Sequence, residues 1–283
     1  MAKLLKGKEI VEKMSADLVA RVEALAVSET NPTLAILRMG ERPDDLSYER
    51  SATKRAESLG IAVRSIVLPE DAPWTELEAA LREVNADSSI HGCLMFRPLP
   101  PHIDEAVACA LLDAGKDVDG ITPASLASVF SGEGPGYPPA TAQACIEVLD
   151  HYGIALEGKR VAVIVRSLVI GKPVAMLALE RNATVTLCHS RTADLPAVCR
   201  AADIVVCATG RARAYGADYF SAGQTVLDVG INFDEEGRLC GDVDLAAVEP
   251  VVDAITPVPG GLGAVTTITL MSHVVRAAQA TLR

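Results

Sequence analysis

The sequence predicts an α/β protein with two domains, each built around a parallel sheet. Amphipathic helical segments alternate with short apolar segments along most of the 283 residues, as in repeated strand–helix–strand units. Residues 160–165 are almost entirely Val, Ile and Ala, which is typical of a strand buried on both faces of a parallel sheet. A Pro/Gly-rich segment at residues 132–139 separates two such series and indicates a connection between domains.

The elements can be assigned in order along the chain. In the first series we expect helices at 8–25, 45–59 and 75–84, and strands at 33–38, 62–68 and 92–96. Gly60 should stop the second of these helices. In the second series we expect a helix at 141–151 and strands near 160–165, 184–188, 203–207 and 225–229. The segment 267–283 should form a helix that packs back on the first domain, so the predicted domains are 1–140 with 267–283, and 141–266.

Composition excludes several classes of protein. The net charge of −11 argues against binding to nucleic acid or to an anionic membrane surface. The longest apolar segments are strand-sized, and the first residues carry no secretion signal, so we expect a cytoplasmic protein outside the membrane. The seven cysteines include no C-x-x-C pair and are interpreted as reduced core residues. The five histidines have no metal-ligand spacing, so we predict no metal site and assign them no catalytic role.

A candidate dinucleotide site follows the strand at 160–165. Gly171 and Pro173 open the next helix, and free N–H groups at a helix start can bind a diphosphate. The second strand is followed by Ser190 and Arg191, where NAD-binding units usually have a carboxylate that holds the ribose hydroxyls. A hydroxyl and a guanidinium suit a 2′-phosphate, which favours NADP, with NAD possible. The loop lacks a complete G-x-G-x-x-G, so an ordinary strand–helix–strand unit without a ligand stays an alternative.

Two later turns extend the candidate cofactor site. Gly210 and Ile231 follow the third and fourth strands of the second series, and ligands of open α/β sheets bind at the carboxyl ends of strands. The predicted cofactor-binding residues are therefore Val165, Arg166, Ser167, Gly171, Ser190, Arg191, Gly210 and Ile231.

A series of motifs in a fixed order is more specific than any one of them. They are Tyr48 to Ile61, Arg97 to Ile103, Lys116 to Gly120, Arg166 to Pro173, Cys188 to Thr192, Asp228 to Asn232, Gly241 to Asp244 and Thr256 to Gly263. With these motifs the chain resembles the bifunctional methylenetetrahydrofolate dehydrogenase/cyclohydrolase family over nearly its whole length. The resemblance implies two α/β lobes around a cleft, a C-terminal Rossmann-like NAD(P)-binding domain, a homodimer, and tetrahydrofolate one-carbon derivatives as substrates.

The resemblance also implies a folate site. Tyr48 and Asp119 would be the catalytic residues: Asp119 would accept two hydrogen bonds from the pterin edge, and Tyr48 would stack on the pterin ring. Pro259, Gly260 and Gly261 would let backbone approach the flat ligand. Without the resemblance, a solvated turn aspartate, a packing tyrosine and a plain tight turn explain these residues as well.

The chain departs from the family pattern at two polar positions. The family has a lysine four residues after the tyrosine, where this chain has Ala52, and a glutamine where it has Phe96. Lys54 should point to another side of the helix, and Arg55 stays protonated and cannot transfer a proton. Water activation needs such groups, whereas hydride transfer does not.

We therefore predict NADP-dependent oxidation of 5,10-methylenetetrahydrofolate to 5,10-methenyltetrahydrofolate in one-carbon metabolism, with weak or absent cyclohydrolase activity. One alternative is a fully bifunctional enzyme in which another residue activates the water. A second is a non-catalytic folate- or nucleotide-binding relative.

Overall fold

The computed structural model describes residues 1–282, which form two compact units. One unit, called here the 13–140 unit, contains Lys13–Ala140 and the chain from Thr267 onward. The other, the 141–266 unit, contains Thr141–Thr266 and also Met1–Glu12. The first twelve residues therefore cluster with the second series of strands, and not with the first as the sequence analysis expected.

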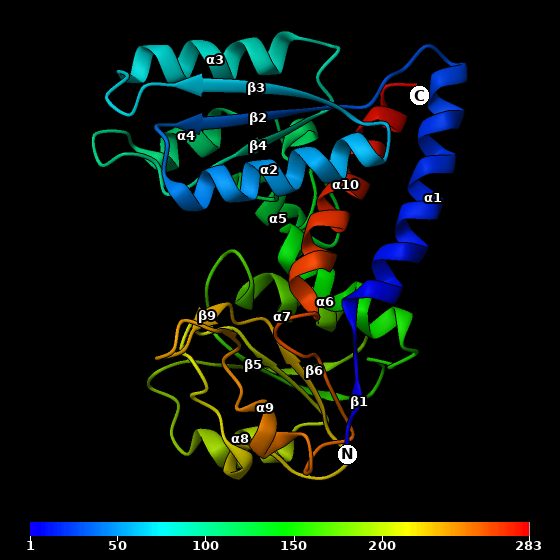
Figure 1. Ribbon diagram of the computed structural model, residues 1–283, viewed down its shortest axis with the longest axis vertical. Helices are drawn as coiled ribbons and strands as arrows, with labels where there is room; N and C mark the ends of the chain where they lie inside the picture. Colours follow the sequence, from blue (N-terminus) through cyan, green and yellow to red (C-terminus); the bar gives the residue numbers. More distant parts are fainter. Residues whose placement is uncertain (283) are drawn as a thin grey trace. The chain divides into compact units, whose positions relative to one another are not determined.

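The 13–140 unit is built on a three-stranded parallel sheet of order β3-β2-β4 (Figure 1). The strands are β2 (Thr33–Met39), β3 (Ala62–Leu68) and β4 (Gly92–Met95), with Leu34 opposite both Val63 and Gly92. Helices α1 (Gly7–Val27), α2 (Pro43–Ser58) and α3 (Trp74–Ala86) alternate with these strands. Gly60 follows the end of α2 with φ +77°, a conformation that suits glycine, so its expected role as a helix stop is confirmed.

Further helices of this unit follow signals at their first residues. Asp104 caps α4 (Glu105–Leu111) by accepting from the N–H groups of Ala106 and Val107. Thr122 caps α5 (Pro123–Ser131), whose first residue is a proline. Neither α4 nor α5 was predicted from the sequence. The helix α6 (Ala140–His151), which lies in the 141–266 unit except for its first residue, begins within one residue of its expected start.

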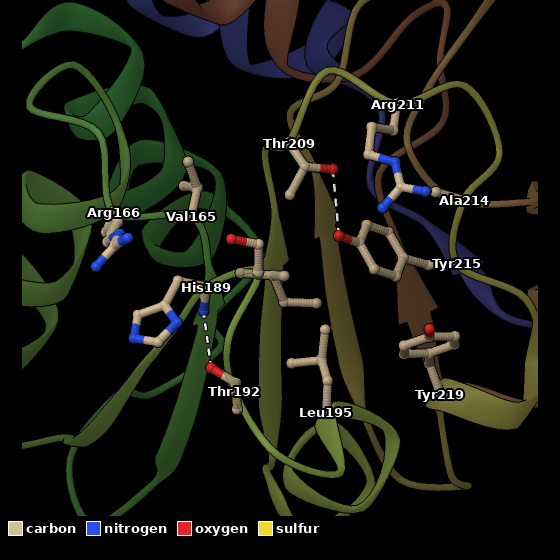
Figure 2. A pocket seen from close by; sticks show the side chains of 12 residues that line it. Val165, Arg166, His189, Thr192, Leu195, Thr209, Arg211, Ala214, Tyr215 and Tyr219 are labelled. Atoms are coloured by element: carbon tan, nitrogen blue, oxygen red, sulfur yellow. Dashed lines mark hydrogen bonds between the residues drawn. The ribbon is translucent and has the colours of Figure 1, made fainter.

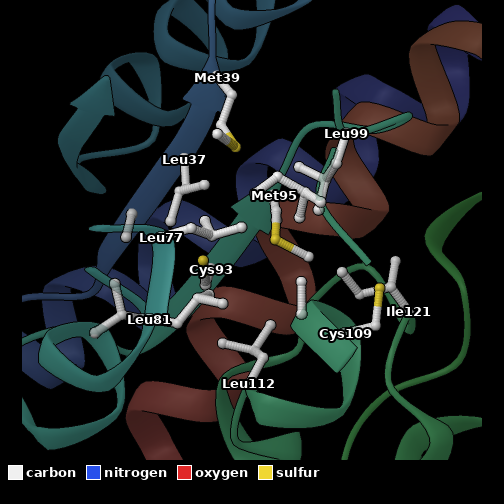
Figure 3. Close-up of a cluster of buried hydrophobic side chains, with 14 of the residues drawn as sticks. Leu37, Met39, Leu77, Leu81, Cys93, Met95, Leu99, Cys109, Leu112 and Ile121 are labelled. Atoms are coloured by element: carbon white, nitrogen blue, oxygen red, sulfur yellow. The ribbon is translucent and has the colours of Figure 1, made fainter. Parts of the chain in front are cut away.

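A core of buried side chains joins the sheet to its helices (Figure 3). Leu37 of β2, Met95 of β4, and Leu77 and Leu81 of α3 converge there, and each is at most 1 % exposed. Burial of such side chains stabilises the unit by about 1.5–3 kcal/mol each. The sheet is therefore a firm base for the loops that follow its strands.

The 141–266 unit contains a six-stranded parallel sheet of order β1-β11-β8-β7-β5-β6. Its strands are β5 (Arg160–Ile164), β6 (Thr184–Cys188), β7 (Ile204–Cys207), β8 (Thr225–Asp228), β11 (Ala254–Ile255) and β1 (Lys3–Leu4). Helices α7 (Gly171–Glu180), α8 (Leu195–Ala201) and α9 (Leu245–Val248), and a hairpin of β9 (Asn232–Phe233) and β10 (Leu239–Cys240), complete it. The predicted α/β class with parallel sheets is confirmed.

The order of these strands has a functional consequence. The chain passes from β5 to β6 on one side and then returns to β7 on the other side of β5. At such a reversal, loops leave the sheet in opposite directions and open a crevice at the carboxyl ends of the strands. The carboxyl ends of β5 and β7 are thus where a ligand is expected.

The final helix, α10 (Leu262–Ala280), begins five residues earlier than predicted. Within the 13–140 unit, Nδ1 of its residue His273 lies 2.8 Å from the carbonyl oxygen of Val118.

All seven cysteines are buried and free. Among residues 1–282, no helix combines the length and the apolar character needed to cross a membrane.

Candidate functional site

A pocket of about 520 Å³ opens at the carboxyl ends of β5, β6 and β7 (Figure 2). Its walls come from the three loops that follow these strands. The lining residues are Ile164, Val165, Arg166, His189, Ser190, Thr192, Leu195, Thr209, Arg211, Ala214, Tyr215 and Tyr219. The pocket therefore lies at the crevice that the strand order predicts.

The turn from β5 into α7 is packed too tightly for a side chain at Gly171. A Cβ atom there would lie 2.1 Å from the carbonyl oxygen of Val165, so only glycine fits. The Ser167 hydroxyl accepts from the N–H groups of Ile170 (3.2 Å) and Gly171 (3.4 Å), and the Ser167 carbonyl accepts from Lys172 (3.0 Å). These N–H groups were expected to be free for a diphosphate. That expectation is wrong in this structure, because Ser167 already uses them.

The loop after β7 is organised by one buried carboxylate, that of Asp242. It accepts hydrogen bonds from the backbone N–H groups of Thr209, Gly210 and Arg211, and from the Thr209 hydroxyl at 2.9 Å. The amide of Asn232 donates to it as well, at 2.9 Å. A charged acceptor with this many donors holds the loop in one conformation. Asp242 thus shapes the pocket wall without lining the pocket.

A second buried carboxylate supports the first. Asp228, at the end of β8, accepts from the N–H groups of Gly230, Asp242 and Val243 at 2.9–3.0 Å. Its burial raises its pKa to about 6, against the lowering effect of these N–H groups. A Cβ at Gly241 would lie 1.8 Å from a carboxylate oxygen of Asp228, which explains the glycine. The two aspartates therefore form one rigid support below the pocket.

Replacing Asp242 should weaken cofactor binding more than folate binding. Asp242→Asn puts an amide NH₂ among the donors, so the 209–211 loop loses acceptors for buried N–H groups. We expect the KM for the dinucleotide to rise roughly 10-fold and the free energy of unfolding to fall by about 2–4 kcal/mol.

Steady-state kinetics and urea unfolding measure both effects. Asp253→Asn is the matched control, since Asp253 is an exposed aspartate of the same unit that accepts one hydrogen bond, from the Gly223 N–H. An unchanged dinucleotide KM in Asp242→Asn would contradict this role for Asp242.

One wall of the pocket is aromatic. Tyr215 and Tyr219 meet edge to face, with ring centroids 5.1 Å apart, and the Tyr215 hydroxyl donates to that of Thr209 at 3.2 Å. With Leu195, these rings give the pocket a flat apolar surface of the kind that accepts an adenine ring.

The residues predicted for the cofactor site are distributed in three ways. Val165, Arg166 and Ser190 line the pocket, while Ser167, Gly171 and Gly210 shape the turns next to it. Arg191 and Ile231 are exposed and do not line it. The pocket-lining residues that were not predicted from the sequence are Ile164, His189, Thr192, Leu195, Thr209, Arg211, Ala214, Tyr215 and Tyr219. Of these residues, only His189 and Thr209 could have been found from the sequence, because they lie just beyond the ends of β6 and β7.

The lining chemistry fits NADP. It contains two guanidinium groups, of Arg166 and Arg211, and the hydroxyl of Ser190, but no aspartate or glutamate. A carboxylate would repel a 2′-phosphate, whereas guanidinium and hydroxyl groups donate to it. Arg166 and Ser190 would hold this phosphate, and the tyrosines would hold the base.

A second group of candidate residues lies in the 13–140 unit. Tyr48 sits on α2, half-buried, and its ring meets Phe96 edge to face at 5.7 Å. Asp119 follows the buried Asp117, whose carboxylate accepts from the N–H groups of Ile121 (3.0 Å) and Thr122 (2.7 Å). These bonds fix the loop that carries Asp119. The carboxyl of Asp119 lies near enough to Tyr48 for its charge to raise the pKa of the Tyr48 hydroxyl.

The electrostatics of this group are unusual. Burial, together with the nearby charge of Asp117, raises the pKa of Asp119 to about 7, against the opposing effect of Arg97. Burial and the charge of Asp119 also raise the pKa of Tyr48, so its hydroxyl stays protonated. No described residue makes a hydrogen bond to the Asp119 carboxyl. It is an acceptor available for a ligand.

Helix α2 presents no ammonium group beside Tyr48. Ala52, one turn further on, is fully buried. Lys54 is exposed, which agrees with its expected direction away from the Tyr48 face, and Arg55 is half-buried. Ala52 and Phe96, both apolar, therefore stand where the family pattern has a lysine and a glutamine.

The turn of Pro259, Gly260 and Gly261 belongs to the 141–266 unit. Gly260 has φ +100° and its carbonyl accepts from the Gly7 N–H at 2.8 Å. A Cβ at Gly261 would lie 2.6 Å from the carbonyl oxygen of Pro257. Both glycines are thus required by the turn itself. Among residues 1–282, no three His, Cys, Asp or Glu side chains are grouped to hold a metal.

Comparison with known proteins matches both parts of the chain. Residues 5–119 match the catalytic domain of tetrahydrofolate dehydrogenase/cyclohydrolase, and residues 139–282 match its NAD(P)-binding domain. The bifunctional protein FolD of Carboxydothermus hydrogenoformans is 48 % identical over 281 residues, covering 99 % of this chain and 98 % of that protein.

Solved structures agree with this match. A bifunctional FolD methylenetetrahydrofolate dehydrogenase/cyclohydrolase from Campylobacter jejuni superposes with a TM-score of 0.97 at 34 % identity, over 99 % of this chain and 100 % of the other. The Trypanosoma brucei enzyme, solved with NADP cofactor and an inhibitor, gives 0.93 at 32 % identity, over 100 % and 99 %.

Proposed function

This chain belongs to the tetrahydrofolate dehydrogenase/cyclohydrolase family, and we propose that it works as a dehydrogenase with little or no cyclohydrolase activity. It oxidises 5,10-methylenetetrahydrofolate to 5,10-methenyltetrahydrofolate with NADP. The observation that carries the proposal is the pair of Ala52, fully buried, and Phe96, packed on Tyr48. The dinucleotide pocket, by contrast, keeps its polar groups.

The oxidation step requires no acid–base group from the protein. NADP, when bound, accepts the hydride that leaves the methylene carbon. A nitrogen lone pair of the folate stabilises the cation that remains, so no side chain has to remove a proton. We propose that Asp119 accepts hydrogen bonds from the pterin edge and that Tyr48 stacks on the ring. Pro259, Gly260 and Gly261 would supply backbone contacts. The task of these residues is to orient the reacting carbon.

Hydrolysis makes an additional demand. Water must be activated or polarised at the methenyl carbon, and this requires a group with an adjustable pKa or a fixed hydrogen-bonding partner. Beside Tyr48 the chain offers a methyl group at Ala52 and a phenyl ring at Phe96. Neither exchanges a proton with water, and for this reason we propose that the second half-reaction is slow.

A paired assay tests the proposal. One arm follows NADP reduction with methylenetetrahydrofolate, and the other follows the loss of methenyltetrahydrofolate absorbance. We expect reduction in the first arm and no acceleration above the buffer rate in the second. Accelerated hydrolysis would favour a fully bifunctional enzyme, and ligand binding without reduction would favour a non-catalytic relative.

Assembly and location complete the proposal. The family resemblance supports a homodimer, with twice the chain mass of 29.7 kDa in light scattering. The seven free, buried cysteines suit a reducing compartment, in support of a cytoplasmic location.

A further inference from the structure

We propose that His189 determines cofactor specificity by donating a hydrogen bond from Nε2 of its neutral imidazole to the 2′-phosphate of NADP. This inference rests on the proposed function, since it concerns the cofactor of that reaction. His189 lies at the end of β6, directly before the predicted phosphate ligand Ser190. From the sequence alone, His189 was expected to have no catalytic role.

The turn that carries His189 has a fixed conformation. Its backbone N–H donates to the Thr192 hydroxyl at 2.9 Å, and its carbonyl accepts from the Thr192 N–H at 2.9 Å. The preceding residue, Cys188, is fully buried in β6. The imidazole therefore leaves the backbone at a defined point on the pocket wall (Figure 2).

One hydrogen bond defines the protonation state of the ring. The Arg191 N–H donates to Nδ1 of His189 over 3.1 Å. A nitrogen that accepts carries no proton, so the proton of the neutral ring is on Nε2. Protonating Nδ1 as well would set two N–H groups against each other. The arrangement thus places the N–H donor of the ring at Nε2.

That donor is free for a ligand. Among the described residues, none accepts a hydrogen bond from Nε2 of His189, and the side chain is half-buried in the pocket wall. Arg166 and Ser190 line the same pocket, and Figure 2 shows the His189 ring at the end of the pocket where Arg166 lies. Together they offer a guanidinium, a hydroxyl and an imidazole N–H, three kinds of donor for the three terminal oxygens of one phosphate monoester.

Two substitutions separate the roles of the two ring nitrogens, Nδ1 and Nε2. His189→Asn keeps an acceptor near the Nδ1 position for the Arg191 N–H but removes the group at Nε2. His189→Gln extends an amide nitrogen toward the Nε2 position but removes the Nδ1 acceptor. The probes are 2′,5′-ADP and 5′-AMP, which differ only in the 2′-phosphate, and their binding is measured by calorimetry on the intact protein.

We expect the wild type to prefer 2′,5′-ADP. A hydrogen bond to a charged group contributes about 1.5–3 kcal/mol, so His189→Asn should bind 2′,5′-ADP about 10- to 100-fold more weakly. Binding of 5′-AMP should change less than about threefold, because it lacks the charged partner. His189→Gln should retain most of the preference.

Several results would overturn the inference. Equal weakening of both probes in His189→Asn would mean that His189 only builds the turn, and unchanged binding of both would mean that it makes no contact. A wild type without any preference for 2′,5′-ADP would instead refute the NADP preference itself, which distinguishes failure of the proposed function from failure of the His189 assignment.

Discussion

Asp119→Asn should lower kcat/KM for methylenetetrahydrofolate by about 100-fold or more, because two charge-assisted hydrogen bonds are lost at about 1.5–3 kcal/mol each and their effects do not add fully. An asparagine offers one acceptor, and its NH₂ group would face a pterin N–H, donor against donor. The carboxyl has no hydrogen bond to a described residue, so the substitution leaves no protein donor without a partner. The loss should therefore fall on folate binding and not on folding.

The same carboxyl predicts a pH dependence. The pKa of Asp119 lies near 7, so below that pH the group is protonated and can accept poorly at the pterin edge. The ionised fraction rises between pH 6 and pH 8, and we expect the KM for folate to fall over that range. Initial rates at several folate concentrations measure it, with Asp119→Asn as the reference that should show no such fall.

Two controls make the result specific. Asp71→Asn is the same substitution at an exposed residue of the same unit and should leave kcat/KM unchanged. The affinity for 2′,5′-ADP should be the same in wild type and Asp119→Asn, since the dinucleotide pocket lies in the other unit. A variant that keeps wild-type kcat/KM would show that Asp119 does not contact the pterin.

Local patterns were sufficient for most of the fold. The strand at 62–68 has the predicted bounds, and the continuous apolar run at 160–165 forms β5, an interior strand between β7 and β6. Both are decided by side chains within a few residues of one another. β1 and β11 were missed because each has two residues and their pairing joins residues 3–4 to residues 254–255, a long-range contact that no local pattern encodes.

The candidate site was predictable only where it follows a strand. Arg166 and Ser190 lie two residues beyond the ends of β5 and β6, so the predicted strands were enough to locate them. Tyr215 and Tyr219 lie in an irregular loop whose course is set by Asp242, more than 20 residues further along the chain. The hydrogen bonds from this loop to the Asp242 carboxylate can be recognised only in the folded structure. Ser167 stays a predicted cofactor-binding residue, and the structure adds that its hydroxyl accepts from the N–H groups of Ile170 and Gly171 at the start of α7.

The double substitution Ala52→Lys with Phe96→Gln should create cyclohydrolase activity. It supplies an ammonium one helical turn from Tyr48 and an amide where a phenyl ring now meets the Tyr48 ring. Acid–base groups of this kind contribute about 100-fold or more to proton-transfer steps. We expect methenyltetrahydrofolate to be hydrolysed about 100-fold faster than in the wild type.

The single variant Ala52→Lys should fail, and the reason lies in burial. Ala52 is fully buried and Phe96 is 8 % exposed, so a lysine at 52 would enter an apolar environment without an acceptor for its charge. An unpaired buried charge costs several kcal/mol and lowers the pKa of the ammonium. We expect a lower melting temperature and no hydrolysis. In the double variant, the Phe96→Gln substitution provides both an acceptor and additional space.

The variant Ala52→Met with Phe96→Gln separates charge from space. Methionine has nearly the length of lysine but carries no proton to exchange. If the ammonium activates water, only the lysine double variant gains hydrolysis, while NADP reduction is retained in both. Equal hydrolysis in the two double variants would mean that Phe96 excludes water by its bulk. The loss of cyclohydrolase activity would then be a matter of access and not of missing acid–base chemistry, because a smaller residue at 96 would restore the reaction by itself.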